Sequence, residues 1–198
     1  MLQLYLIRHG ETPWSITGQH TGFTDIALTP HGEDEARALA PCLRTIHFTR
    51  ILVSPLLRAR QTCELAGLWV EAQIEADLVE WNYGDYEGKR TVDIHQERPA
   101  WNVWRDGCPH GETPANISDR ADRLLTRLRI LSGNVALFSH GQFGSALAAR
   151  WIGLAVSEGQ HFALGAASIS ILAFETGHPR VPVIALWNAV QPTLRVSP

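Results

Sequence analysis

Short apolar runs, each followed by a turn and a helical pattern, constrain the fold of this chain more than any other feature. Runs of four to seven apolar residues bounded by turn residues are typical of buried strands. The expected strands are Leu4–Ile7, Arg50–Val53 and Val135–Phe138, with a late pair at Ser168–Phe174 and Val181–Leu186. Strands that alternate with helices form a mostly parallel sheet with helices on both faces. We therefore predict an α/β protein with a single domain over residues 1–198.

Capping residues mark where the helices begin. Thr29 and Thr113 are each followed by Pro, which is the preferred pairing of an N-cap with the first helical position. Apolar residues at i, i+3, i+4 and i+7 then indicate one buried face in each helix. Two further helices, over 56–68 and 142–152, are expected directly after the second and third strands.

Basic residues stand where three of the predicted strands end. Arg8 and His9 follow the first strand, His140 follows the third, and both histidines precede a glycine. Arg58 lies in the first turn of the helix after the second strand, whereas Arg60 points about 200° away and is expected at the surface or in an ion pair. Taken singly, Arg8 could pair with an acidic neighbour and His9 could fill the core. Together, at one edge of a parallel sheet, these side chains predict an anion site.

Composition excludes several other classes of protein. The 198 residues carry a net charge of -3, which gives no general basic field for nucleic acid or acidic lipid. No secretory signal and no run of about 20 apolar residues is visible, so a cytoplasmic protein without a membrane span is expected. Cys42, Cys63 and Cys108 lack metal or redox spacing, and no HExxH pattern occurs, so we expect neither a metal nor a cofactor.

Two irregular segments are expected to surround the anion site. Residues 14–25 are polar, contain glycine and are too irregular for a helix, and loops after strand ends often carry function. Residues 80–112 mix acidic residues, glycines and tryptophans, and we expect them to form a cap-like insertion. Trp81, Trp101 and Trp104 are predicted to make the small core of that insertion.

Four motifs in this order resemble those of the histidine phosphatase superfamily, the phosphoglycerate mutase-like proteins. They are RHGETPW, SPLLRARQT, EWNYGDYEG and SHG, and the resemblance covers nearly the whole chain. Within the family the motifs look most like the sedoheptulose-1,7-bisphosphatase-type branch. The resemblance implies a phosphoglycerate mutase-like three-layer sandwich with a mostly parallel central sheet.

The resemblance also implies a role for each residue of the anion site. His9 would attack phosphorus and form a phosphohistidine, which divides one displacement into two. Arg8, Arg58 and His140 would surround the phosphoryl oxygens. Glu80 would protonate the leaving oxygen and then activate water, unless it merely pairs with one of the arginines. No metal takes part in such a reaction.

The resemblance is less specific about contacts with the rest of the substrate. The residues expected to touch phosphate or substrate are Ser15, His20, Thr21, Gly22, Tyr83, Gly141 and Gln142. His20, Ser15 and Gln142 differ from the residues usual in the family. Ser145 stands where an Arg is common, and the loss of that cation puts a bisphosphate substrate in doubt.

The sequence therefore predicts a metal-independent phosphatase acting on a small phosphate monoester, with a sugar phosphate as the first candidate. A phosphoglycerate mutase is the nearest alternative, although mutases of this family tend to be longer. A module that binds or dephosphorylates phosphoprotein is a third reading, which a cap over the site disfavours. The tryptophan-rich surface leaves a homo-oligomer open.

Overall fold

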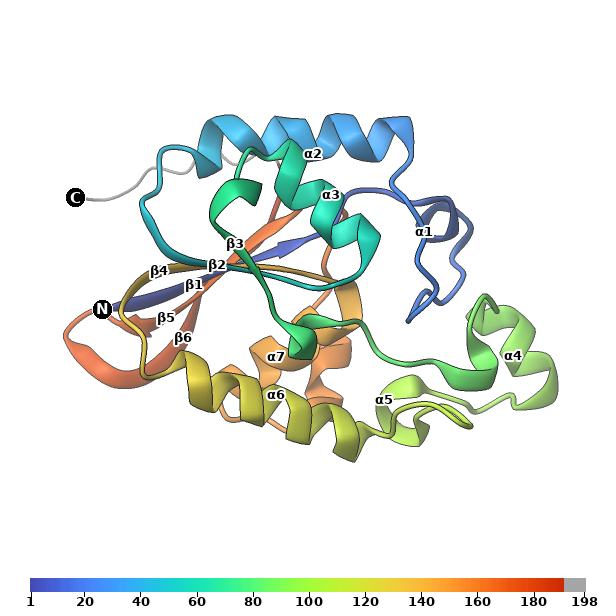
Figure 1. Ribbon diagram of the computed structural model, residues 1–198. Helices are drawn as coiled ribbons and strands as arrows, with labels where there is room; N and C mark the ends of the chain where they lie inside the picture. The colour runs from blue at the N-terminus through green and yellow to red at the C-terminus, as the bar shows by residue number, and fades with distance from the viewer. Residues whose placement is uncertain (191–198) are drawn as a thin grey trace.

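The computed structural model describes residues 1–190, and its centre is a six-stranded sheet in the order β3-β2-β4-β1-β5-β6 (Figure 1). The strands are β1 (Leu2–Arg8), β2 (Phe48–Val53), β3 (Ala72–Ile74), β4 (Gly133–Ser139), β5 (Ile169–Glu175) and β6 (His178–Ala189). Neighbouring strands among β3, β2, β4 and β1 are parallel. β5 joins β1 antiparallel and forms a hairpin with β6, so the predicted late pair is confirmed within a mixed sheet.

Helices cover both faces of this sheet (Figure 1). The helices are α1 (Pro13–Thr17), α2 (Pro30–Leu43), α3 (Leu57–Leu65), α4 (Thr91–Glu97), α5 (Val103–Asp106), α6 (Pro114–Leu128) and α7 (Gly141–Trp151). Short 3₁₀ turns are η1 (Trp69–Glu71), η2 (Ala76–Leu78), η3 (Gly84–Tyr86) and η4 (Val156–His161). α2 and α3 lie on one face, and α6 and α7 on the other. None of these helices is long and apolar enough to cross a bilayer.

The alternation of side chains along β1 builds the two halves of the core. Leu4 and Leu6 pack with residues of α6 and α7, whereas Tyr5 and Ile7 pack with residues of α2 and α3. Successive side chains of a strand point to opposite faces, so a strand buried on both sides is apolar at every position. The predicted three-layer α/β fold is confirmed.

The register of the parallel strands decides where the site lies. Arg8 of β1 pairs with Ser139 of β4, and Val53 of β2 pairs with Phe138 of β4. The three strands therefore end at one level, and the next residues along the chain, which include His9 and His140, emerge side by side. This edge is the usual ligand-binding edge of a parallel sheet.

Two expectations about local structure need correction. The segment 14–25 is not wholly irregular, because its first residues belong to α1 (Pro13–Thr17); Thr12 and Ser15 form the capping box that starts this helix. The helix predicted over 56–68 ends at Leu65, because Gly67 adopts a left-handed φ of 79° and the chain turns there.

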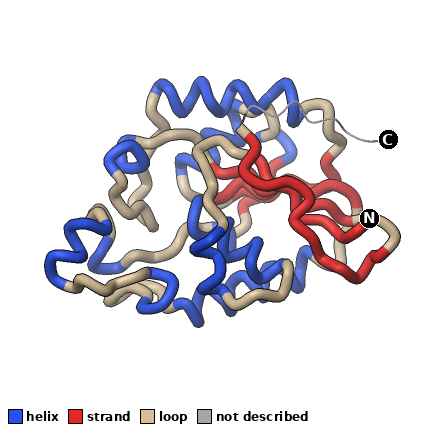
Figure 2. The backbone as a smooth tube through the Cα atoms, turned by 180° about the vertical axis from the view of Figure 1, so that it is seen from behind, coloured by secondary structure: helices blue, strands red, loops and turns tan. Residues whose placement is uncertain are grey.

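The segment 80–112 projects beyond the strand ends and carries α4 and α5, as the view from behind also shows (Figure 2). Trp81 and Trp101 are buried and Trp104 is half-buried. The rings of Trp81 and Trp104 meet edge to face at 5.4 Å. These side chains are continuous with the core beneath α6 and α7, so the insertion does not have the separate core that we expected.

Candidate active site

His9 lies immediately after β1 and is nearly inaccessible to solvent. Its Nδ1 lies 2.7 Å from the carbonyl oxygen of Gly10, and a carbonyl only accepts, so Nδ1 carries the proton. Nε2 then carries the lone pair of the ring, which accepts a hydrogen bond from Nε of Arg58 at 3.3 Å. Burial, followed by the charges of Arg58 and Arg8, holds the pKa of His9 well below 6.5. The ring is a neutral imidazole of one defined tautomer.

Arg58 is fully buried in the first turn of α3, where the sequence predicted it. Besides His9, its guanidinium donates to the carbonyl oxygens of Thr21, Gly22 and Thr24 at 2.8 to 3.1 Å. No carboxylate within residues 1–190 forms an ion pair with it. Arg58 thus holds the segment after α1 against His9 and brings a positive charge next to the ring.

Arg8 and His140 complete the surroundings of His9. Arg8 donates from Nη1 to the carbonyl of Leu164, and its buried Nε has no hydrogen-bond partner among the described residues. The ring of His140 lies 5.2 Å from that of His9, centre to centre. His140 Nε2 lies 2.8 Å from Ser54 Oγ, and its Nδ1 is buried without a partner among the same residues. The unpaired N–H of Arg8 suits an oxyanion, whose oxygens accept hydrogen bonds, and Nδ1 of His140 does so in the tautomer that carries its proton there.

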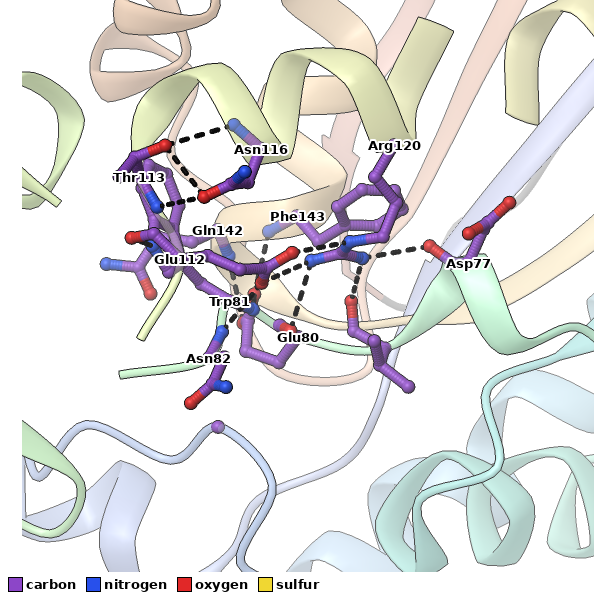
Figure 3. A network of polar contacts seen from close by, with 12 residues as sticks. Asp77, Glu80, Trp81, Asn82, Glu112, Thr113, Asn116, Arg120, Gln142 and Phe143 are labelled. Carbon is purple, nitrogen blue, oxygen red and sulfur yellow. Dashed lines mark hydrogen bonds and ion pairs between the residues drawn. The ribbon is translucent and has the colours of Figure 1, made fainter. Parts of the chain in front are cut away.

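Glu80 stands at the same edge, bound to the first turn of α7 (Figure 3). Its Oε1 accepts from the backbone N–H groups of Trp81 and Phe143, at 2.9 and 2.7 Å, and its Oε2 accepts from that of Gln142 at 3.0 Å. A helix N-terminus favours a carboxylate through its free N–H groups. Glu80 is therefore held by backbone donors and not by an arginine, which removes the ion-pair reading left open above.

A cavity of about 400 Å³ opens at this edge. The residues predicted from the sequence that line it are Arg8, His9, Ser15, His20, Thr21, Glu80, Tyr83, Gly141, Gln142 and Ser145. Arg58 and His140 lie behind His9, buried from solvent, and do not line the cavity.

Gly22 also lies outside the cavity lining, in contrast to the substrate contact that we expected. Its N–H donates to Glu87 and its carbonyl accepts from Arg58. A Cβ at this position would lie 2.6 Å from the carbonyl oxygen of Trp81, so glycine permits a close backbone approach.

Sequence reasoning missed much of the far wall of the cavity. Gln160, Phe162 and Leu164 reach it from η4 and the chain that follows. Trp104 also lines the wall, although we had assigned it only to packing. No motif marks these positions, because the fold of distant segments brings them here.

The wall of the cavity away from His9 carries little charge. Burial lowers the pKa of His20 to about 4, so this ring is neutral at pH 7. It stacks on Tyr83 with ring centres 4.6 Å apart, and the Tyr83 hydroxyl donates to Gln142 Oε1. Apart from the histidines and Tyr83, the ionisable side chains in the lining are Arg8 and Glu80, both beside His9. No group of His, Cys, Asp and Glu within residues 1–190 could hold a metal ion.

A neutral histidine set against buried arginines, with a carboxylate beside it, has the components needed for phosphoryl transfer. The fold and the site thus define an α/β protein of the phosphoryl-transfer class. From residue 4 to residue 188 the sequence matches the model of the histidine phosphatase superfamily (branch 1). The chain therefore belongs to the histidine phosphatase superfamily, and it is a phosphatase of that superfamily.

Individual relatives agree with this assignment. The chain is 41% identical over 194 residues to an acid phosphatase of Mycobacterium tuberculosis, which covers 96% of this chain and 95% of that one. It is 38% identical over 186 residues to the sedoheptulose 1,7-bisphosphatase of Saccharomyces cerevisiae, covering 77% and 68%. A solved structure of a Mycobacterium tuberculosis open reading frame product matches with a TM-score of 0.87 and 39% identity, covering 96% and 98%. The expected family and its resemblance to the bisphosphatase branch are confirmed.

Proposed function

We propose that this protein is a metal-independent phosphomonoesterase that hydrolyses a small phosphorylated metabolite through a phosphohistidine on His9. The observation that carries the proposal is the state of the His9 ring. Its Nδ1–H is fixed on Gly10, and within residues 1–190 its Nε2 lone pair accepts a hydrogen bond only from Nε of Arg58, at 3.3 Å. A nucleophile needs a lone pair, and the neutral ring has one at Nε2 alone, which becomes free to attack once the Arg58 hydrogen bond is broken.

In the first step, His9 Nε2 attacks phosphorus, the N–P bond forms and the bond to the leaving oxygen breaks. N–H groups of Arg8 bind the phosphoryl oxygens in the cavity, where charge accumulates in the transition state. Arg58 and His140 act from behind His9, Arg58 through its positive charge and His140 through its contact with the His9 ring. Donors that are buried and already oriented need little rearrangement during the reaction. In the second step, water attacks the phosphohistidine, releases phosphate and restores the neutral ring.

Glu80 supplies and then removes a proton. In the first step its carboxylic acid protonates the leaving oxygen, and in the second the resulting carboxylate takes a proton from the attacking water. Its Oε2 accepts a single backbone hydrogen bond, from Gln142, and so keeps a lone pair free for that proton. Its position in the cavity wall, next to His9 and Arg8, supports this assignment.

The uncharged far wall favours an uncharged leaving group. The neutral His20, the amides of Gln142 and Gln160 and the ring of Phe162 offer hydrogen bonds and apolar surface but no second cation. Ser145, which lies where a cation would be needed for a second phosphate, donates its hydroxyl toward the carbonyls of Gly141 and Phe162. A sugar monophosphate fits this chemistry better than a bisphosphate or a phosphoglycerate.

The test is phosphate release from a panel of sugar phosphates, phosphoglycerates and nucleotides in the presence of EDTA. We expect release from a sugar monophosphate, and after rapid quenching an alkali-stable, acid-labile phosphate on the protein. His9→Ala should abolish both signals. His20→Asn, which changes another histidine of the same cavity, should leave the phosphohistidine in place. Transfer of phosphate between phosphoglycerates without release would contradict the proposal, as would full activity in His9→Ala.

A further inference from the structure

One buried arginine outside the cavity binds the segment that carries Glu80 (Figure 3). Arg120 lies on α6 and is 6% exposed. Its Nη1 donates to the carbonyl oxygens of Asp77 and Val79 at 2.9 and 2.7 Å, and its Nη2 donates to that of Glu80 at 3.2 Å. Three carbonyls within four residues thus converge on one guanidinium. The backbone at Glu80 cannot turn without breaking these bonds.

The remaining donors of Arg120 bind Glu112, at the end of the 80–112 segment. Nε and Nη2 each lie 2.9 Å from a different carboxylate oxygen, so the ion pair is bidentate and uses the last two N–H groups of the guanidinium. Glu112 in turn accepts from the backbone N–H of Asn82 through Oε2 and from Trp81 Nε1 through its carbonyl. Arg120 thus binds the backbone up to and including Glu80, and Glu112 binds the two residues that follow it.

The same guanidinium also contacts the helix that binds the Glu80 carboxylate. Arg120 Cζ lies 4.1 Å from the ring centre of Phe143, and the backbone N–H of Phe143 donates to Glu80 Oε1. Arg120 therefore contacts both the backbone of Glu80 and the first turn of α7. The position of the Glu80 carboxylate depends on both, because its backbone carries it and the N–H groups of that turn bind it. Its own side chain does not line the cavity.

We propose that Arg120, through its pair with Glu112, is a positioning residue that sets the carboxyl group of Glu80 in the geometry for proton transfer to the leaving oxygen. The inference rests on the acid role of Glu80 in the proposed function. A rigid guanidinium fork with five donors can hold three carbonyls and one carboxylate at once, which the single ammonium of lysine cannot. The contacts of Arg120 and Glu112 thereby fix the position of the Glu80 carboxyl group without touching the reacting atoms.

A purely structural role and a positioning role predict different dependence on the leaving group. A nitrophenolate ion leaves phosphorus without prior protonation, whereas an alkoxide needs the proton of the acid. We would compare kcat/KM, which reports the first bond-breaking step, for p-nitrophenyl phosphate and glycerol 2-phosphate. Loss of the acid, or a shift in its position, lowers the second value far more than the first.

The variants are Arg120→Met, Arg120→Lys and Glu80→Gln, with Arg123→Met as the matched control. Arg123 lies one turn further along α6 and pairs with Asp77 of the same segment, but it is exposed and touches no carbonyl of Glu80. Glu80→Gln should lower kcat/KM for the alkyl phosphate by about 10²- to 10⁴-fold. Arg120→Met should lower it by about 10²-fold, the effect of a misplacement of about 1 Å. Arg123→Met should leave both values unchanged.

Thermal melting shows whether each variant is folded, and Arg120→Lys keeps the inference testable if Arg120→Met does not fold, because it keeps a cation beside Glu112. Selective loss on the alkyl phosphate in a folded Arg120 variant supports the inference. Equal losses on both substrates in that variant, with Glu80→Gln still selective, overturn the inference and leave the proposed function intact. If Glu80→Gln itself loses both activities equally, the acid role fails and the inference fails with it.

Discussion

Burial of three neutral histidines, His9, His140 and His20, makes the stability of this protein depend on pH between 7 and 5. Burial and the charge of Arg58 hold the pKa values of His9 and His140 well below 6.5, the ordinary value that both regain on unfolding. Below pH 6.5 the unfolded chain therefore binds protons that the folded chain does not. The free energy of unfolding must fall as the pH falls through this range.

The magnitude follows from the pKa of the unfolded chain. From pH 7 to pH 5, protonation of one ordinary histidine stabilises the unfolded state by a factor of about 25, or about 2 kcal/mol. The His9 and His140 rings, which stay neutral in the folded protein, give about 4 kcal/mol together, and His20, whose pKa of about 4 keeps it neutral down to pH 5, raises the sum to about 6 kcal/mol. Asp106 acts outside this window, because its hydrogen bond to Arg105 lowers its pKa to about 2, and that stabilisation is lost only below about pH 4.

The assay is urea unfolding followed by tryptophan fluorescence at pH 7, 6 and 5 in buffers free of phosphate. Wild-type protein should lose about 6 kcal/mol over this range, and His9→Gln, which cannot titrate at position 9, should lose about 4 kcal/mol whatever its stability at pH 7. A wild-type loss of about 2 kcal/mol or less, or an unchanged slope in His9→Gln, would refute the reasoning that His9 and His140 are buried neutral.

Three further predictions test the surroundings of His9. Phosphate at 100 times its Kd should stabilise the protein by about 2.7 kcal/mol and raise its Tm by about 5–11 °C, measured by calorimetry; Arg58→Met should lose this shift. Gly10→Ala should cost about 1–3 kcal/mol in urea unfolding, because its Cβ would collide with the Gly32 carbonyl, whereas Gly165→Ala, with room for a Cβ, should cost little. Ser54→Ala should lower kcat/KM and alter the ¹⁵N shifts of the His140 ring, because the ring loses its Nε2 partner; unchanged shifts would contradict that contact.

The convergence of Arg8, His9, Arg58 and His140 was predictable because these residues share one property that can be seen in the sequence. His9 and His140 lie one residue beyond apolar runs, and Arg58 lies in the first turn of the helix after another, so each stands near the end of a parallel strand. Parallel strands joined by helices end at the same edge of a sheet. Residues more than a hundred positions apart in the sequence, such as His9 and His140, could therefore be predicted to lie close together without knowledge of any side-chain contact.

Other features depend on side-chain packing and could not be predicted in this way. Gly22 was assigned to the substrate, but its neighbours Glu87 and Arg58 show that it serves close backbone packing. Gln160 and Phe162 reach the cavity from a segment without any motif. In each case the decisive contact joins elements far apart in the sequence, and no local pattern encodes it.

Residue pattern alone decides the order of strands and helices and the edge of the sheet at which Arg8, His9 and His140 converge. These features follow from apolar periodicity, capping residues and strand ends, which are local. Tertiary structure decides the tautomer of His9, the backbone donors that bind the Glu80 carboxylate and the hydrogen bonds from Arg120 to the backbone at Glu80. Those states depend on distances of a few ångströms between atoms of distant segments, and only the packed fold sets such distances.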